Sequence, residues 1–119
     1  MKRLFLTVMA VLSMTMTFAE DENLNTTNNM QAYNMEVNYN KLGEALDLTS
    51  DQLEAVKDVH QMFCTNMMSA AAASEESREA MMKNAIKMDL RYMRSILNYK
   101  QYKHYLLLLN TTLVNRGLR

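Results

Sequence analysis

The sequence predicts an all-α protein, a small hairpin or bundle of about four helices. Two observations support this fold class. Apolar residues recur every three or four positions from Ala32 onward, which is the spacing of amphipathic helices. The chain has 119 residues with no Pro and only two Gly, so the residues that usually mark β-turns are almost missing. This length fits one small domain.

The first 19 residues resemble a cleaved secretory signal peptide. Residues 1–3 are basic at Lys2 and Arg3, residues 4–12 are apolar, and residues 17–19 offer a small-residue cleavage site. The apolar run is shorter than the roughly 20 residues of a membrane span. An N-terminal core helix is the alternative. We therefore expect a periplasmic or secreted protein with no membrane span after cleavage.

Charge is divided between the two halves of the chain. Removal of Lys2 and Arg3 leaves 11 basic and 13 acidic residues, a net charge of about −2. Residues 20–77 hold 11 acidic and two basic residues, whereas residues 78–119 hold nine basic and two acidic ones. This division favours packing of one half on the other or antiparallel pairing of two chains, although solvated helix faces would look the same. An exported protein is a poor candidate for nucleic-acid binding.

Residues 20–30 are rich in Asn and Thr and are expected to form a disordered leader before a helical domain at residues 31–119. From Ala32, a spacing of three to four predicts a short first helix with its apolar side at Met35, Tyr39, Leu42 and Leu46.

A capping box marks the start of the next helix. Thr49 is the expected N-cap, its hydroxyl accepting from the Gln52 backbone while the Gln52 side chain returns to Thr49. Leu48 and Leu53 flank this box as a hydrophobic staple. The pattern returns near the C-terminus with Leu97, Asn98, Gln101 and Tyr102.

The repeated Leu-Thr-x-x-Gln pattern resembles the paired signature of the Spy/CpxP family of periplasmic stress proteins. The resemblance covers roughly residues 43–105, and the second copy departs from it because Asn98 stands in place of Thr. It implies an all-helical fold, a curved antiparallel dimer, and a role as an ATP-independent chaperone or a modulator of envelope stress. Metal-binding stress proteins are related to the same family.

The capping box begins a helix whose apolar stripe includes Leu53, Val56, His60, Phe63, Met67 and Ala70. Ser74 is then expected to cap a third helix, with Glu75 and Glu76 at its positive end. The apolar residues after Ser74 continue the helical spacing of those before it, so one unbroken helix of residues 49–97 is an open alternative.

The third helix carries an apolar arc of about 200°, roughly twice what one neighbouring helix can cover. The excess faces a second helix, a second subunit or a client protein. Methionine adapts to many partner shapes, so an apolar surface with a basic rim is a candidate client-binding site, at Met81, Met82, Met88, Met93, Lys83, Lys87 and Arg91. Burial of the whole arc in a bundle or dimer is the alternative.

The fourth helix extends from Asn98 to about Asn115, with an apolar stripe that includes Tyr102, Leu106 and Leu113. Gly117 suits the left-handed position that follows a helix.

Residues able to carry chemistry are few. His60 and Cys64 lie one helical turn apart, but no acceptor that would orient the imidazole is evident, so we expect no enzyme. His60, Cys64 and Met67 are weak candidates for a soft metal ion, and we expect no cofactor. No phosphate-binding loop is present, so ATP is not implied. A lone Cys64 could link two subunits or be buried.

Asp89 lies within the apolar arc of its helix, and His60 lies within that of the preceding helix. If the chain folds back at Ser74, the two residues are nearly equidistant from the turn. We therefore expect a buried pair of His60 and Asp89 that raises the histidine pKa. A partner elsewhere for Asp89, such as a Lys, Arg or Tyr, is the alternative.

The function expected from these patterns is that of a periplasmic, ATP-independent chaperone or stress modulator, a homodimer that binds unfolded or partly folded proteins. A periplasmic metal sensor or buffer and a helical partner-binding or structural module are the alternatives. A domain this small has little core energy to spare, which favours dimerisation.

Overall fold

The structure of the protein is a computed structural model that describes residues 30–119. The predicted signal peptide and residues 20–29 of the predicted leader lie outside the described residues. The described part of the chain contains four α-helices and no strand, which confirms the predicted all-α class. Among residues 30–119, no helix combines the length and the apolar character needed to cross a membrane.

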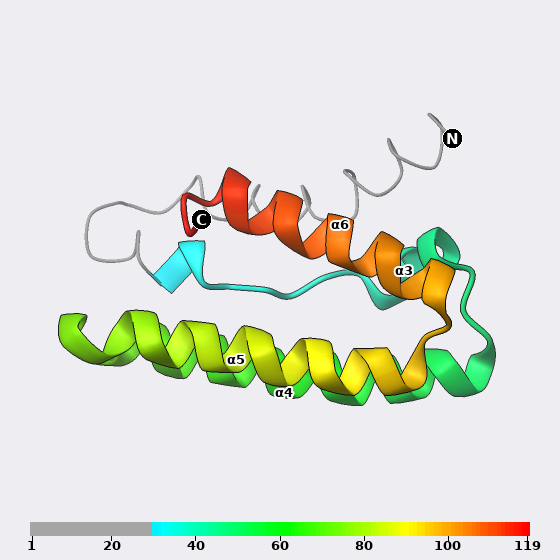
Figure 1. Ribbon diagram of the computed structural model, residues 1–119, viewed down its shortest axis with the longest axis horizontal. Coiled ribbons are helices and arrows are strands. Elements are labelled where there is room, and N and C mark those ends of the chain that lie inside the picture. Colours follow the sequence, from blue (N-terminus) through cyan, green and yellow to red (C-terminus); the bar gives the residue numbers. More distant parts are fainter. Residues whose placement is uncertain (1–29) are drawn as a thin grey trace.

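The fold has two layers (Figure 1). Helices α4 (Ser50–Ala72) and α5 (Glu75–Ile96) pack against each other as an antiparallel hairpin. Helix α6 (Tyr99–Asn115), helix α3 (Tyr39–Leu46) and an extended segment between residues 33 and 39 lie over one face of that hairpin. The core lies between the layers, and its most deeply buried side chains are Leu46, Val56, Phe63, Met67, Met93, Leu108 and Leu113.

A break between α4 and α5 settles the choice between a hairpin and one long helix. Ala73 and Ser74 are both extended, with ψ angles of 170° and 156°, so the chain leaves the helical path and returns. Ser74 is the N-cap of α5, as predicted, but its side chain makes no capping bond and donates instead to the Ser77 hydroxyl at 3.3 Å. The hairpin prediction is therefore confirmed, whereas the predicted side-chain cap is not formed.

The predicted first helix is shorter than expected. A helical turn ends at Ala32, the chain is then extended, and α3 starts only at Tyr39. The asparagines explain this start, because Asn34 Oδ1 accepts from the Glu36 backbone and Asn38 Oδ1 caps α3 at Lys41, each at 3.1 Å. Such side-chain bonds compete with helix formation. Met35, which was expected on this helix, lies instead in the extended segment.

Helix α6 ends as the sequence predicts. Gly117 has a φ of 75°, in the left-handed region. The Leu118 backbone donates to Leu113 at 2.8 Å and the Gly117 backbone to Val114 at 3.0 Å, which is the Schellman arrangement. This turn holds Arg116 next to residues 32–34, where its guanidinium donates to the carbonyl oxygens of Ala32 and Asn34.

Candidate functional site

Both predicted capping boxes are present. Thr49 Oγ1 accepts from the Gln52 backbone at 3.1 Å, and Gln52 Oε1 accepts from the Thr49 backbone at 3.1 Å. Asn98 and Gln101 make the same two bonds at 2.8 and 3.0 Å. Each box satisfies two backbone N–H groups that a helix start otherwise leaves unpaired.

The two boxes are also bonded to each other, which the sequence did not show. Gln52 Nε2 donates to Gln101 Oε1 at 2.8 Å, and Gln101 Nε2 donates to Gln52 Oε1 at 3.1 Å. The second N–H of each amide reaches a carbonyl, that of Ile96 for Gln52 and that of Asp47 for Gln101. We call this amide pair the glutamine clasp. It uses all the donors of both side chains and fastens the start of α4 to the start of α6.

The apolar residues of the two motifs take part in the same corner. Leu97 is buried, and Leu48 and Tyr102 are half-buried against the core. Leu53 lies over Gly43 of α3, where an added Cβ would come within 3.3 Å of its Cδ1 atom. The motif residues Leu48, Thr49, Gln52, Leu97, Asn98 and Gln101 therefore form one structural unit. Asn98 and Gln101 also line a cavity of about 370 Å³ together with Glu44, Asp47, Lys100 and His104.

His60 and Asp89 are both buried, but the predicted bond between them is not formed. The His60 Nε2 atom lies 2.6 Å from the backbone oxygen of Met35. Asp89 accepts instead from the hydroxyl of Tyr105, the alternative in which a tyrosine is the partner. The predicted rise in the His60 pKa is also wrong, because burial lowers this pKa and only the Met35 contact opposes it.

Asp89 is the most perturbed carboxyl group of the described residues. Burial raises its pKa to about 7, although the hydrogen bond from Tyr105 opposes the rise. Its Oδ1 atom has no hydrogen-bond partner among the described residues. Burial also raises the pKa of Tyr105, so its hydroxyl remains the donor.

The weak metal candidates do not form a site. His60 is engaged with Met35, and Met67 is fully buried in the core. Burial, with the charges of Glu36 and Asp89, raises the Cys64 pKa to about 12, so the thiol stays protonated and is a poor ligand and nucleophile. Within residues 30–119, no three His, Cys, Asp or Glu side chains are placed to hold a metal ion. Cys64 is a half-buried free thiol.

The predicted client-binding methionines separate into two sets. Met82 and Met93 belong to the core, with exposed fractions of 8% and 0%, so their assignment to a client-binding surface is wrong. Met81 is exposed and Met88 is half-buried. The physical reason is that α6 and α4 together cover most of the 200° arc, leaving only one edge of it open.

That open edge continues onto α4. Met62, Met81 and Tyr92 are 44%, 38% and 42% exposed. Met81, Met88 and Tyr92 share one stripe of α5, and Met62 shares one with the half-buried Val59 on α4. Met62 and Met88 lie 12 and 14 residues from Ser74, so the two stripes stand at similar heights along the hairpin. We call Val59, Met62, Met81, Met88 and Tyr92 the outer seam.

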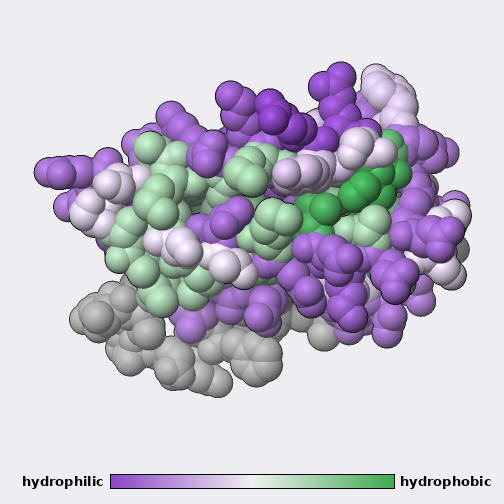
Figure 2. All heavy atoms as spheres, turned by 90° about the horizontal axis from the view of Figure 1, so that it is seen from below, coloured by the Kyte–Doolittle hydropathy of each residue, from purple (hydrophilic) through white to green (hydrophobic). Residues whose placement is uncertain are grey.

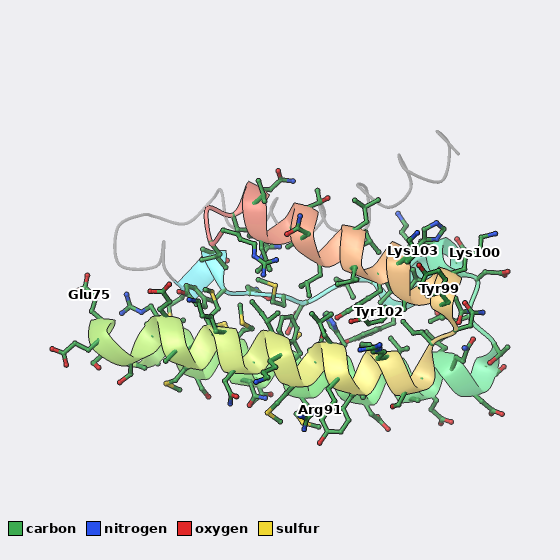
Figure 3. The ribbon with its side chains drawn as sticks, viewed as in Figure 1. Glu75, Arg91, Tyr99, Lys100, Tyr102 and Lys103 are labelled. Atoms are coloured by element: carbon green, nitrogen blue, oxygen red, sulfur yellow. The ribbon has the colours of Figure 1, made fainter. Side chains whose placement is uncertain are left out.

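The outer seam lies on the face of the hairpin away from α6. Seen from that side, apolar residues form a band that is bordered by hydrophilic ones (Figure 2). Arg91 points away from α6 on this side (Figure 3). Lys87, Arg91 and Arg94 are exposed, and no ion pair is present for them within residues 30–119. Lys83 is also exposed and pairs with Glu79 at 3.4 Å.

Met62 was missed by sequence analysis because it lies outside the main apolar stripe of its helix. The signal that could have found it is its distance from the turn at Ser74, which is similar to that of Met88 on α5. A second exposed group lies at the start of α6, where Lys103 Nζ is 5.3 Å from the centre of the Tyr99 ring (Figure 3).

Comparisons of the chain with protein-family models, with curated proteins and with solved structures each find no match. The resemblance to the Spy/CpxP family therefore stays a prediction that rests on the two motifs.

Proposed function

We propose that this protein is an exported, ATP-independent chaperone or envelope-stress modulator that holds non-native polypeptides on the outer seam. The observation that carries the proposal is the exposure of Met62, Met81 and Tyr92 on one face of the hairpin. An apolar face that a folded monomer leaves open is a characteristic of binding surfaces.

The chemistry of the outer seam suits partners of varied shape. Unbranched methionine side chains can adopt many conformations at little cost, so they contact irregular apolar segments. Arg91, one helical turn after Met88 on α5, is exposed and has no ion pair among the described residues, whereas the exposed Asp58, one turn before Met62, adds negative charge at the α4 edge. The positive charge of α5 would attract acidic segments before apolar contact is made.

A second copy of the chain is also proposed as a partner. The predicted homodimer would shield apolar surface that the two-layer monomer leaves open, and a domain of this size gains from such burial. Dimer and client could share the outer seam in turn, because both recognise its apolar side chains.

The proposal can be tested by following aggregation of an unrelated unfolding protein without ATP. We expect the chain to suppress aggregation and the variant Met62→Gln/Met81→Gln/Tyr92→Gln to lose most of this effect while keeping its helical circular dichroism. The matched control is Leu107→Gln/Val114→Gln, which removes two exposed apolar side chains from α6 on the other layer.

Equal losses of aggregation suppression in the two variants would show that exposed apolar side chains anywhere on the surface cause the effect. That result would contradict the assignment to the outer seam. No suppression by the unaltered chain would contradict the chaperone proposal itself. Arg91→Gln/Arg94→Gln should weaken suppression of acidic clients more than that of basic ones, and added salt should reduce the difference.

A further inference from the structure

Residues 33–38 form no helix, and we call them the strap. The strap passes between α6 and the α4–α5 hairpin (Figure 1). Tyr33 and Met35 are buried and Val37 is half-buried, whereas Glu36 and Asn38 are exposed. This alternation is that of an extended chain with one side against the core.

Side chains from both neighbouring helices hold the strap by its backbone. His60 of α4 contacts the Met35 carbonyl oxygen through Nε2 at 2.6 Å. Arg116, just after α6, donates to the carbonyl oxygens of Ala32, at 3.4 Å, and of Asn34. Of these contacts, the one made by His60 depends on the protonation state of the imidazole.

The His60 contact fixes the tautomer of the ring. A carbonyl oxygen only accepts hydrogen bonds, so Nε2 must carry a proton. In the neutral ring Nδ1 is then unprotonated, and this atom is buried with no hydrogen-bond partner among the described residues. A second proton would place a donor and a positive charge where no acceptor is available, which is costly in a buried site.

The surroundings of His60 offer little compensation for that charge. The Tyr39 ring of α3 stands edge-on at 5.8 Å and the Phe63 ring of α4 is at 5.7 Å. From α6, Tyr105 and Arg116 line the same small cavity as the imidazole, and Arg116 has the same charge as an imidazolium. Further titratable groups act on these neighbours of His60. Lys57 Nζ of α4 lies 5.9 Å from the centre of the Tyr39 ring, the charges of Glu36 and Asp89 act on Cys64 of α4, and Asp89 is also bonded to Tyr105.

We propose that the strap is an acid-released latch, in which a second proton on His60 frees residues 33–38 from the groove between α4 and α6. Space for this movement exists along the open edge of the strap. A cavity of about 20 Å³ lies beneath Met35 and Val37. An open groove of about 490 Å³, lined by Asn34, Glu36, Cys64 and Met68 among others, runs along its edge.

Release of the strap uncovers an apolar groove distinct from the outer seam. Leu42, Leu108 and Leu109 line the small cavity under the strap together with His60. The strap lies on the opposite side of the hairpin from the outer seam. The latch proposal therefore does not depend on whether clients bind the outer seam.

The direction of the pH effect follows from the His60 pKa. Burial lowers the pKa of the held imidazole below 6.5, and release returns it toward that value. The open form therefore binds more protons, and the open fraction rises as pH falls below 6.5, by at most about tenfold per pH unit. Asp89 acts in the opposite direction, because its raised pKa makes the folded state more stable as pH falls through 7. Acid therefore favours release of the strap through His60 while it stabilises the folded domain through Asp89. The opposite signs distinguish local release of the strap from global unfolding.

Hydrogen exchange of the full chain between pH 7.5 and 5, corrected for intrinsic exchange rates, tests the latch. We expect peptides that cover residues 33–38 to lose protection by several-fold or more per pH unit below 6.5, while α4 and α6 keep theirs. His60→Gln retains a donor for the Met35 carbonyl but cannot titrate, so its strap should show no such pH dependence. The matched control is His104→Gln, which removes the other histidine of the chain and should behave like the unaltered protein.

Three results would overturn the latch. They are an equal loss of protection in all helices, an unchanged strap at pH 5, and a pH dependence that persists in His60→Gln. If that variant does not fold, ¹⁵N chemical shifts of the unaltered protein decide instead. A His60 ring that is protonated at pH 5 while the strap stays protected would contradict the proposal.

Discussion

Buried polar residues set the pH behaviour of the domain at the scale of single side chains. Asp89 accepts a hydrogen bond from Tyr105 through one oxygen, and its other oxygen is without a partner among the described residues. The folded-state pKa of about 7 compares with an ordinary value of 3.8. In the unfolded chain the Asp89 carboxyl loses its proton near pH 4, whereas in the folded protein it keeps the proton until about pH 7. The contribution of Asp89 to the free energy of unfolding therefore becomes less favourable as pH rises from about 4 to about 7.

Asp89→Asn should therefore stabilise the protein at pH 8. The amide oxygen can still accept from Tyr105, and the cost of a buried ionisable group is removed. We expect a gain of about 1 to 3 kcal/mol in the free energy of unfolding at pH 8, and little or none at pH 4.5. Urea denaturation at the two pH values measures both quantities.

The matched control for this change is Asp58→Asn, at an exposed aspartate of α4, which should change stability by a few tenths of a kcal/mol at most. A loss of stability at pH 8 in Asp89→Asn would mean that the ionised carboxylate is favourable, and would contradict the direction assigned to its pKa.

At the scale of elements, the glutamine clasp joins two helix starts that are each stabilised locally. Gln52 and Gln101 cap their own helices and also satisfy one another. Loss of either amide leaves the other with an unpaired donor and acceptor in a partly buried place, so their effects on stability cannot be independent.

A double-mutant cycle tests this coupling. Gln52→Ala and Gln101→Ala should each lower the free energy of unfolding by about 1 to 2 kcal/mol, and the double variant should lose less than the sum by about 0.5 to 1 kcal/mol. Gln61→Ala, at an exposed glutamine of the same helix, is the control. Strict additivity would show that the bond between the amides contributes nothing measurable.

The elements were predictable where their causes are local. The boxes of Thr49 and Asn98 and the left-handed Gly117 follow from neighbouring residues, and the structure confirms them. The strap and the partners of His60 depend on residues far apart in the chain, such as Met35, so periodicity assigned them wrongly. The amide pair was missed for the same reason.

At the scale of the whole molecule, the two-layer arrangement decides which apolar residues remain open. Periodicity correctly gave α5 more apolar surface than one neighbour could cover. It could not tell that α6 and the hairpin would bury Met82 and Met93 while leaving Met62 and Met81 exposed, because that choice depends on how the layers pack.

Self-association can be measured by sedimentation velocity over a wide range of concentration. We expect a reversible monomer–dimer equilibrium, shifted toward monomer by Met62→Gln/Met81→Gln because the interface loses apolar area. Leu107→Gln/Val114→Gln serves again as the control and should leave the equilibrium unchanged. A monomer at every concentration would contradict the predicted homodimer.

The glutamine clasp also bears on the order in which the chain assembles. Each capping box closes over three residues, so both helix starts can form while the chain is still expanded. The bond between Gln52 and Gln101 spans 49 residues, and it must wait until the hairpin has brought the ends of that loop together. Because the entropy lost on closing a loop grows only with the logarithm of its length, the late step carries little extra cost. The two copies of the motif thus act in two steps: each capping box starts its own helix early, and the bond between the two glutamines forms last.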